Sequence, residues 1–148
     1  MYEHLLVPVD GSELSRKAMA HALGLAKMLG AAVTGFTAEP PLPILQVELA
    51  AVAYDVVAFQ EHDKRCEAHA RELLGGFAAQ AKAAGVRFDG QFVITDDVQQ
   101  AIVDMARKHG CDLIVMATHG RHGLDALIHG SLTKSVLAHS QVPLLVVH

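Results

Sequence analysis

The sequence predicts an α/β fold, with a five-stranded parallel sheet carrying helices on both faces, formed by a single domain over residues 1–148. Two patterns indicate this fold class. Short runs of β-branched and other apolar residues alternate with longer stretches of helical periodicity along the whole chain. The run that follows Asp112, up to Ala117, is continuously apolar, which is typical of a central strand covered on both faces. The length of 148 residues fits one domain with a sizeable core.

The first strand and helix are marked by a short apolar run followed by capping residues. Leu5–Val9 is expected to form the first strand. Ser12 or Ser15 could cap the next helix, because serine side chains accept hydrogen bonds from the free N–H groups of a first turn. Apolar residues recur at helical spacing up to Leu29, and Gly30 is expected to end the helix.

A second strand and a long helix come next. Ala32–Ala38 is expected to be the strand, and the prolines at positions 40, 41 and 43 then break the chain. An Ala-rich helix is expected from about Val47 to Ala84. Glycine favours helix formation poorly, so this helix is expected to be bent or interrupted at Gly75-Gly76.

The second half of the chain continues the alternation. Asp96 or Asp97 is expected to cap a short helix that ends near Gly110, and Gly130-Ser131 to open a last helix that ends near His139. The third, fourth and fifth strands are expected over residues 86–94, 112–117 and 142–147.

Composition excludes several classes of function. The net charge is −4 and no basic block occurs, so nucleic-acid binding has no electrostatic support. No apolar run approaches the roughly 20 residues that span a bilayer, and the N-terminus lacks the pattern of a signal peptide. We therefore expect a cytoplasmic protein in which the two cysteines, Cys66 and Cys111, are free and reduced.

A loop rich in glycine and hydroxyl residues follows the fourth strand and is the main candidate for a binding site. Glycines let a ligand approach the main chain, and the start of the last helix offers free N–H groups and the positive end of a helix dipole. Such an arrangement suits the phosphates of a nucleotide. The candidate residues are Ala117, Thr118, His119, Gly120, Arg121, His122, Gly123, Gly130, Ser131, Leu132 and Thr133.

From the spacing alone, this loop is equally explained as an ordinary turn followed by a helix cap. No Gly-Lys-Ser/Thr follows the glycines, so it is not a Walker A loop. Asp10-Gly11-Ser12 after the first strand does not have the G-x-G-x-x-G spacing of a dinucleotide-binding turn. His119, His122 and Arg121 could contact a ligand or lie exposed in the loop.

The chain resembles the universal stress protein family over essentially its whole length. Leu5–Ser12 is similar to the family's first strand and turn, and the segment from Asp112 to Val147 is the more specific match. The nucleotide-binding branch of the family carries G-x2-G-x9-G-S/T. This chain has Ala117-x2-Gly120-x9-Gly130-Ser131, with alanine in place of the first glycine. The resemblance implies an adenine nucleotide alpha hydrolase-like fold with strand order 3-2-1-4-5.

The resemblance also implies roles for individual residues. ATP is the implied ligand, and its phosphates and ribose would lie at the loop from Ala117 to Thr133. Pro8, Val9 and Asp10 match the end of the family's first strand, where an aspartate lies near the phosphates and assists a Mg²⁺ or Mn²⁺ ion. Thr37 matches the position whose backbone recognises adenine. From the residues alone, Asp10 could instead share the capping of the first helix with Ser12.

Two functions of different classes follow from the resemblance. One is a regulatory module of the stress response that binds ATP or another adenine nucleotide. The other is a dimeric interaction protein of the same fold without a nucleotide, which Ala117 favours. No catalytic constellation is visible, so an enzyme would be at most a slow ATPase.

Three residues of the long helix could form a metal site. His62, Cys66 and His69 fall at positions i, i+4 and i+7, on one helix face, and imidazole with thiolate suits zinc or copper. The alternative is a surface helix with one part-buried cysteine. This alternative is favoured, because a metal site usually needs a fourth ligand and none is evident nearby.

The last strand suggests a dimer interface. Pro143–Val147 is strongly apolar and ends the chain, and an uncovered strand edge invites pairing with another strand. The family resemblance implies a homodimer through this strand, with two-fold symmetry. The alternative is that the segment from Pro40 to Ala53 covers an edge strand.

Overall fold

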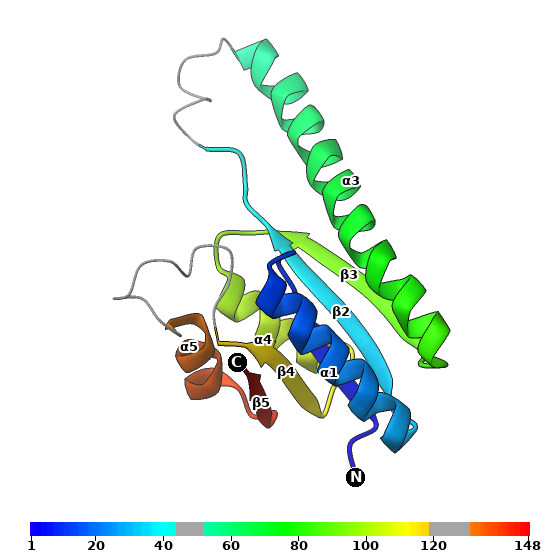
Figure 1. Ribbon diagram of the computed structural model, residues 1–148. Coiled ribbons are helices and arrows are strands. Elements are labelled where there is room, and N and C mark those ends of the chain that lie inside the picture. The colour runs from blue at the N-terminus through cyan, green and yellow to red at the C-terminus, as the bar shows by residue number, and fades with distance from the viewer. Residues whose placement is uncertain (44–51, 119–130) are drawn as a thin grey trace.

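The computed structural model describes residues 1–43, 52–118 and 131–148, and in these ranges it contains a parallel sheet with helices on both faces (Figure 1). The sheet has five strands in the order β3-β2-β1-β4-β5, and every neighbouring pair is parallel. The predicted fold class and strand order are thus confirmed. The strands are β1 (His4–Pro8), β2 (Ala32–Glu39), β3 (Phe88–Ile94), β4 (Leu113–Ala117) and β5 (Leu144–Val147).

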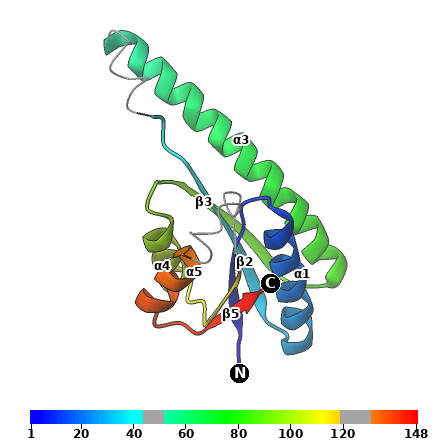
Figure 2. The same ribbon diagram turned by 60° about the vertical axis from the view of Figure 1, so that its left-hand side comes forward.

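The helices form two layers, one on each face of the sheet (Figure 2). They are α1 (Glu13–Leu29), α3 (Val52–Ala84), α4 (Val98–Lys108) and α5 (Ser131–His139). Side chains of α1 and α3 pack with β1, β2 and β4 in one core, which includes Leu5, Val33 and Val115. Those of α4 and α5 pack with the opposite face of the same strands in a second core, which includes Phe36 and Ile114. The central strands are therefore apolar on both sides.

Helix α1 begins and ends where its capping residues allow. The Oγ atom of Ser12 accepts a hydrogen bond from the N–H group of Ser15 at 3.1 Å, so Ser12 is the cap. Ser15 is buried, and its own hydroxyl donates to the Ser12 carbonyl at 3.0 Å. Gly30 ends the helix with φ of +69°, a conformation that glycine adopts without a steric penalty.

Helix α3 differs from the prediction because it is not interrupted at Gly75-Gly76. Leu74 and Phe77, on either side of the two glycines, are buried against the sheet and hold the helix in place. Tertiary packing thus overrides the weak helix propensity of glycine. The N-terminal part of α3 extends beyond the sheet (Figures 1 and 2).

The contact between α3 and the sheet depends on two glycines in neighbouring strands. A Cβ atom at Gly35 of β2 would lie 3.3 Å from Cδ2 of Leu74, and one at Gly90 of β3 would lie 3.2 Å from Cβ of Leu74. Gly35 and Gly90 are paired in register. Together they leave the space in which the Leu74 side chain lies.

Gly76→Ala is expected to stabilise the fold by about 1 kcal/mol, because an exposed glycine inside a helix costs conformational entropy that alanine does not. A Cβ atom at this position would meet no atom within 4 Å. Urea unfolding measures the effect. Gly85→Ala is the matched control, and it should destabilise the protein because Gly85 has φ of +73°. Equal destabilisation by both substitutions would contradict this account.

Candidate functional site

The candidate site lies at the carboxyl ends of the central strands. β1 and β4 are neighbours, with Leu5 opposite Leu113 in the register. The chain leaves β1 toward α1 on one face of the sheet, whereas α5, which follows β4, packs on the other face. Ligands of open α/β sheets bind where the connections diverge in this way. The structure therefore brings the predicted residues Pro8, Val9 and Asp10 to the same edge as the end of β4.

Asp10 shapes the turn between β1 and α1. Its Oδ1 atom accepts a hydrogen bond from the N–H group of Ser12 at 2.9 Å, and its own N–H group donates to Oγ of Ser15 at 3.4 Å. Gly11 follows with φ of +81°. Ser12 is the N-cap residue of α1, and Asp10 orders the turn that precedes the helix. This turn also holds the Asp10 carboxylate near the end of β1.

The start of α5 is fixed to the end of β4. The hydroxyl of Thr133 donates a hydrogen bond to the Ala117 carbonyl at 3.2 Å, and the Thr118 N–H group donates to the Val147 carbonyl at 3.0 Å. Ser131 and Leu132, which begin the helix, are exposed. While Thr133 makes this bond, its hydroxyl proton is not available to a phosphate. The N–H groups at the start of α5 are therefore the stronger candidates for contacts with an anion at this edge.

Ala117 adopts an ordinary strand conformation. It is the last residue of β4, and among the described residues only glycines have positive φ. Its side chain is buried in the core on the α1 side of the sheet. Alanine at this position therefore carries no backbone strain.

The register of β2 determines which neighbouring strand each backbone group near its end faces. The carbonyl of Phe36 accepts a hydrogen bond from the N–H group of Val9 at 2.8 Å, so the backbone of Phe36 faces β1. Backbone groups of successive strand residues point alternately to the two sides, and Thr37 therefore faces β3, where it pairs with Phe92. The backbone of Ala38, not that of Thr37, points to the side of the candidate site. Sequence reasoning could not assign these directions, because the alternation depends on the register of β1 against β2.

Thr37 has a second notable property. It is only 1% exposed, and its hydroxyl has no hydrogen-bond partner within the described part of the chain. Buried hydroxyls are nearly always paired. Thr37 is thus a buried hydroxyl without a hydrogen-bond partner in the described part of the chain, and it lies two residues before the end of β2.

The remaining predicted loop residues, namely His119, Gly120, Arg121, His122, Gly123 and Gly130, lie outside the described residues.

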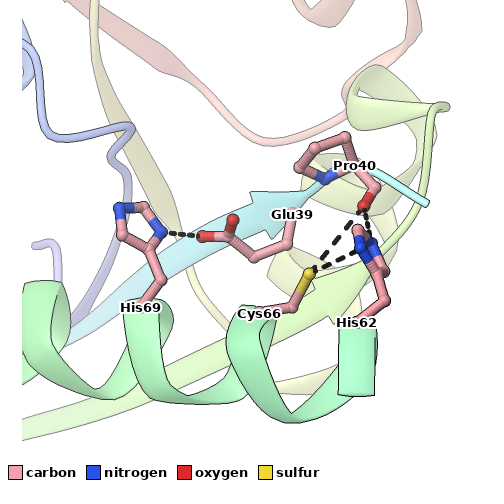
Figure 3. A network of polar contacts seen from close by, with 5 residues as sticks. All are labelled: Glu39, Pro40, His62, Cys66 and His69. Carbon is pink, nitrogen blue, oxygen red and sulfur yellow. Dashed lines mark hydrogen bonds and ion pairs between the residues drawn. The ribbon is translucent and has the colours of Figure 1, made fainter. Parts of the chain in front are cut away.

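A polar network joins α3 to the end of β2 (Figure 3). Nδ1 of His69 lies 2.7 Å from Oε1 of Glu39, whose side chain is almost fully buried. One turn away, Nε2 of His62 lies 3.3 Å from Sγ of Cys66 and 2.8 Å from the Pro40 carbonyl oxygen. His69 is thus engaged by a carboxylate of another element. Among the described side chains, no group of three His, Cys, Asp or Glu residues is arranged to hold a metal, and His62, Cys66 and His69 are no exception.

Neither cysteine is an activated nucleophile. Burial raises the pKa of the Cys111 thiol to about 11, an effect that a hydrogen bond with Thr34 partly offsets. Burial also raises the pKa of Cys66, and the negative charges of Glu39 and Asp63 raise it further. Both thiols therefore stay protonated near neutral pH, and neither forms a disulfide, as predicted.

The stability of the fold is expected to fall as the pH rises from about 9 to about 11, in part because of Cys111. In this range the unfolded chain loses the thiol proton, whereas the folded chain keeps it, so deprotonation favours unfolding. Urea unfolding at several pH values measures the slope. In Cys111→Ala the slope should be shallower, and an unchanged slope would contradict the assignment.

In the described part of the chain, no helix is long and apolar enough to cross a membrane.

The chain is similar in sequence to proteins of one known family. The family model described as the universal stress protein family matches residues 1–148. A universal stress protein of Methanocaldococcus jannaschii is 27% identical over 147 residues, covering 99% of this chain and 82% of the relative. One of Staphylococcus aureus is 30% identical over 148 residues, covering 99% and 84%.

Solved structures share the fold. The universal stress protein UspA of Lactobacillus plantarum superposes with a TM-score of 0.82 at 23% identity, covering 99% of this chain and 98% of that one. A universal stress protein in complex with cAMP gives 0.71 at 24% identity, covering 99% and 97%. One from Archaeoglobus fulgidus in complex with dAMP gives 0.65 at 16% identity, covering 99% and 98%. With the family model matched along the full length, the chain belongs to the universal stress protein family.

Proposed function

We propose that this chain binds an adenine nucleotide, ATP with Mg²⁺ or Mn²⁺, and acts in the cytoplasm as a regulatory module of the stress response. The observation that carries the proposal is the divergence point between β1 and β4, where the start of α5 is fixed beside the end of β4 by the bond from Thr133 to Ala117. The relatives in complex with cAMP and dAMP support an adenine nucleotide as the ligand class.

The phosphates are best accommodated at the start of α5. The first turn of this helix has no acidic side chain, whereas the first turn of α1 carries Glu13 and follows Asp10. The dipole and free N–H groups of α5 therefore favour an anion, and those of α1 are already complemented by carboxylates. In this proposal the N–H groups of Ser131, Leu132 and Thr133 bind phosphate oxygens.

The rest of the nucleotide would extend from α5 across the ends of β4 and β1 to β2. Asp10 would hold the Mg²⁺ or Mn²⁺ ion that accompanies the phosphates, since carboxylate oxygens are the ligands these ions prefer. The backbone of Ala38, next to Thr37, would face the adenine. The loop residues His119, Gly120, Arg121, His122, Gly123 and Gly130 would complete the phosphate and ribose site.

Ala117 does not favour the alternative of a protein without nucleotide. The glycine of the family motif could be needed for positive φ or for close approach of a ligand to the main chain. The strand conformation of Ala117, which needs no positive φ, and the burial of its side chain in the core support nucleotide binding with alanine at this position.

Isothermal titration of ATP with Mg²⁺ into the purified protein tests the proposal. The expected result is one ATP per chain with micromolar affinity, and a much weaker signal for GTP, because the ligand is recognised through adenine. No heat and no thermal shift at millimolar ATP would contradict the proposal.

We further propose a homodimer through β5. This strand lies at the edge of the sheet, and Leu145 within it is 40% exposed. A second copy of the strand would pair with that edge about a two-fold axis. Light scattering should give twice the chain mass of 15.8 kDa at micromolar concentration, and a monomeric mass would refute the dimer.

A further inference from the structure

The face of α3 that carries His62, Cys66 and His69 lies against the end of β2 (Figure 3). Nδ1 of His69 lies 2.7 Å from Oε1 of Glu39, the last residue of β2. Nε2 of His62 lies 2.8 Å from the carbonyl oxygen of Pro40, the next residue. A carbonyl oxygen can only accept, so Nε2 of His62 carries the proton and donates this hydrogen bond. Two histidines of one helix thus hold the last residue of β2 and the residue after it.

The main chain at the end of β2 is also held by the two neighbouring strands. The Glu39 carbonyl accepts a hydrogen bond from the Thr95 N–H group at 2.9 Å, on the side of β3. The Phe36 carbonyl accepts one from the Val9 N–H group at 2.8 Å, on the side of β1. Ala38 lies between these two anchored residues and is half-buried. Within the described part of the chain, the N–H and C=O groups of Ala38 have no hydrogen-bond partner, so they are available to a ligand.

We infer that His62 and His69 are positioning residues for adenine recognition, because they hold the Ala38 main chain in one orientation toward the base. This inference rests on the proposed function. A C=O group beside an N–H group matches the edge of adenine, which has the N6 amino group as a donor and N1 as an acceptor. Guanine has the reverse pattern, with O6 as an acceptor and N1–H as a donor. A fixed strand end therefore favours adenine, and a strand end that can move loses this preference.

The pair between His69 and Glu39 has the larger effect, because it neutralises a buried charge. The Glu39 side chain is 6% exposed, whereas that of His69 is 46% exposed. A carboxylate buried without a partner is unfavourable, and it regains hydration only by moving toward solvent. Loss of the His69 N–H donor should therefore displace Glu39, and with it Ala38, the preceding residue of the strand.

His69→Leu and His69→Asn separate the hydrogen bond from the shape of the side chain. Leucine and asparagine both branch at Cγ and are similar in size, but only asparagine has an N–H group near the position of Nδ1. In full-length His69→Leu, the affinity for ATP with Mg²⁺ should fall about tenfold, and the preference for ATP over GTP should fall by a similar factor. In His69→Asn, both should stay within about threefold of the wild type. Titration calorimetry with ATP and with GTP measures both quantities.

The same comparison applies to His62. His62→Met removes the donor, whereas His62→Gln keeps an N–H group near the position of Nε2. His62→Met should reduce the preference for ATP over GTP, and His62→Gln should retain it. Its effect should be smaller than that of His69→Leu, because no buried charge is left unpaired.

Arg71→Leu is the matched control for the loss of an ion pair on α3. Arg71 pairs with Glu67 of the same helix, and its side chain is largely exposed, so its removal leaves no buried charge. Both nucleotide affinities should be unchanged. Hydrogen exchange without nucleotide reports on the strand end itself, and residues 36–40 should exchange faster in His69→Leu than in the wild type, His69→Asn or Arg71→Leu.

The outcomes distinguish this inference from the proposed function. If the wild type prefers ATP to GTP and His69→Leu does so equally, the inference is wrong and the proposed function stands. The same holds if His69→Leu weakens ATP and GTP binding by one factor, or if His69→Asn loses as much as His69→Leu. A wild type that binds no ATP overturns the proposed function, and the inference with it. Circular dichroism confirms that each variant is folded.

Discussion

The variant Ser131→Asp is expected to bind ATP at least about 100-fold more weakly than the wild type, while its thermal stability is kept or raised. The substitution places a carboxylate at the start of α5, where the proposal puts the phosphates. Two like charges about 4 Å apart at an effective dielectric constant of about 20 repel by about 4 kcal/mol, and screening reduces this to roughly 3 kcal/mol. The same carboxylate complements the helix dipole and should not destabilise the fold.

Ser131→Asn is the matched control for this prediction. Asparagine has the shape of aspartate without the charge, and the Ser131 side chain is exposed, so neither variant disturbs the core. Titration calorimetry gives the affinities and a thermal melt gives the stability. If both variants lose affinity for ATP equally, the loss is caused by the shape of the side chain and not by its charge. If neither variant loses affinity, the phosphates do not lie at the start of α5.

Gly35→Val is expected to destabilise the fold by about 3 kcal/mol, because no space exists for a side chain between β2 and α3. A Cβ atom at Gly35 would lie 2.6 Å from Cζ and 2.9 Å from Cε2 of Phe88, and 3.3 Å from Cδ2 of Leu74. Valine adds two further carbon atoms at the same point. Phe88 and Leu74 would have to move, and α3 would be displaced from the sheet. The melting temperature should fall by roughly 6–12 °C for a chain of this size.

Gly24→Val serves as the control for the same change of residue. Gly24 is exposed on α1, and a Cβ atom there would meet no atom within 4 Å. Since valine forms helix better than glycine does, this variant should be at least as stable as the wild type. A small effect of Gly35→Val in urea unfolding would show that α3 does not depend on close contact with β2.

The order of strands and helices could be predicted from the sequence because it depends on local patterns. The continuously apolar run Leu113–Ala117 forms β4, and Gly30 ends α1 through its own backbone conformation. Which of Ser12 and Ser15 caps α1 could not be predicted from the local sequence. Ser15 is buried by the fold and donates back to Ser12, which a sequence pattern does not reveal.

The errors arise where distant parts of the chain meet. Gly75-Gly76 does not interrupt α3, because Leu74 and Phe77 fix the helix to the sheet. The pairing of His69 with Glu39 of β2 is likewise a contact between distant parts of the chain, which helical spacing alone could not reveal.

The sequence predicted which strand ends meet at the candidate site, but not the direction in which their backbone groups point. The segments at the ends of β1 and β4 do meet at one edge, as the parallel order requires. The assignment of an adenine-facing backbone to Thr37 is the part that the register does not favour, since that backbone faces β3 and the backbone of Ala38 faces β1. A shift of one residue along a strand reverses the side to which the backbone groups point. The assignment therefore depends on strand pairing and not on composition.

Native mass spectrometry with competing nucleotides tests the central claim most directly. The protein is mixed with ATP and GTP in equal amounts, together with Mg²⁺, and the mass of each chain is recorded. Adenine nucleotide binding at the start of α5 predicts one ATP per chain in the wild type, little GTP, and no nucleotide in Ser131→Asp. A wild-type spectrum with no nucleotide, or with ATP and GTP in equal proportion, would contradict it.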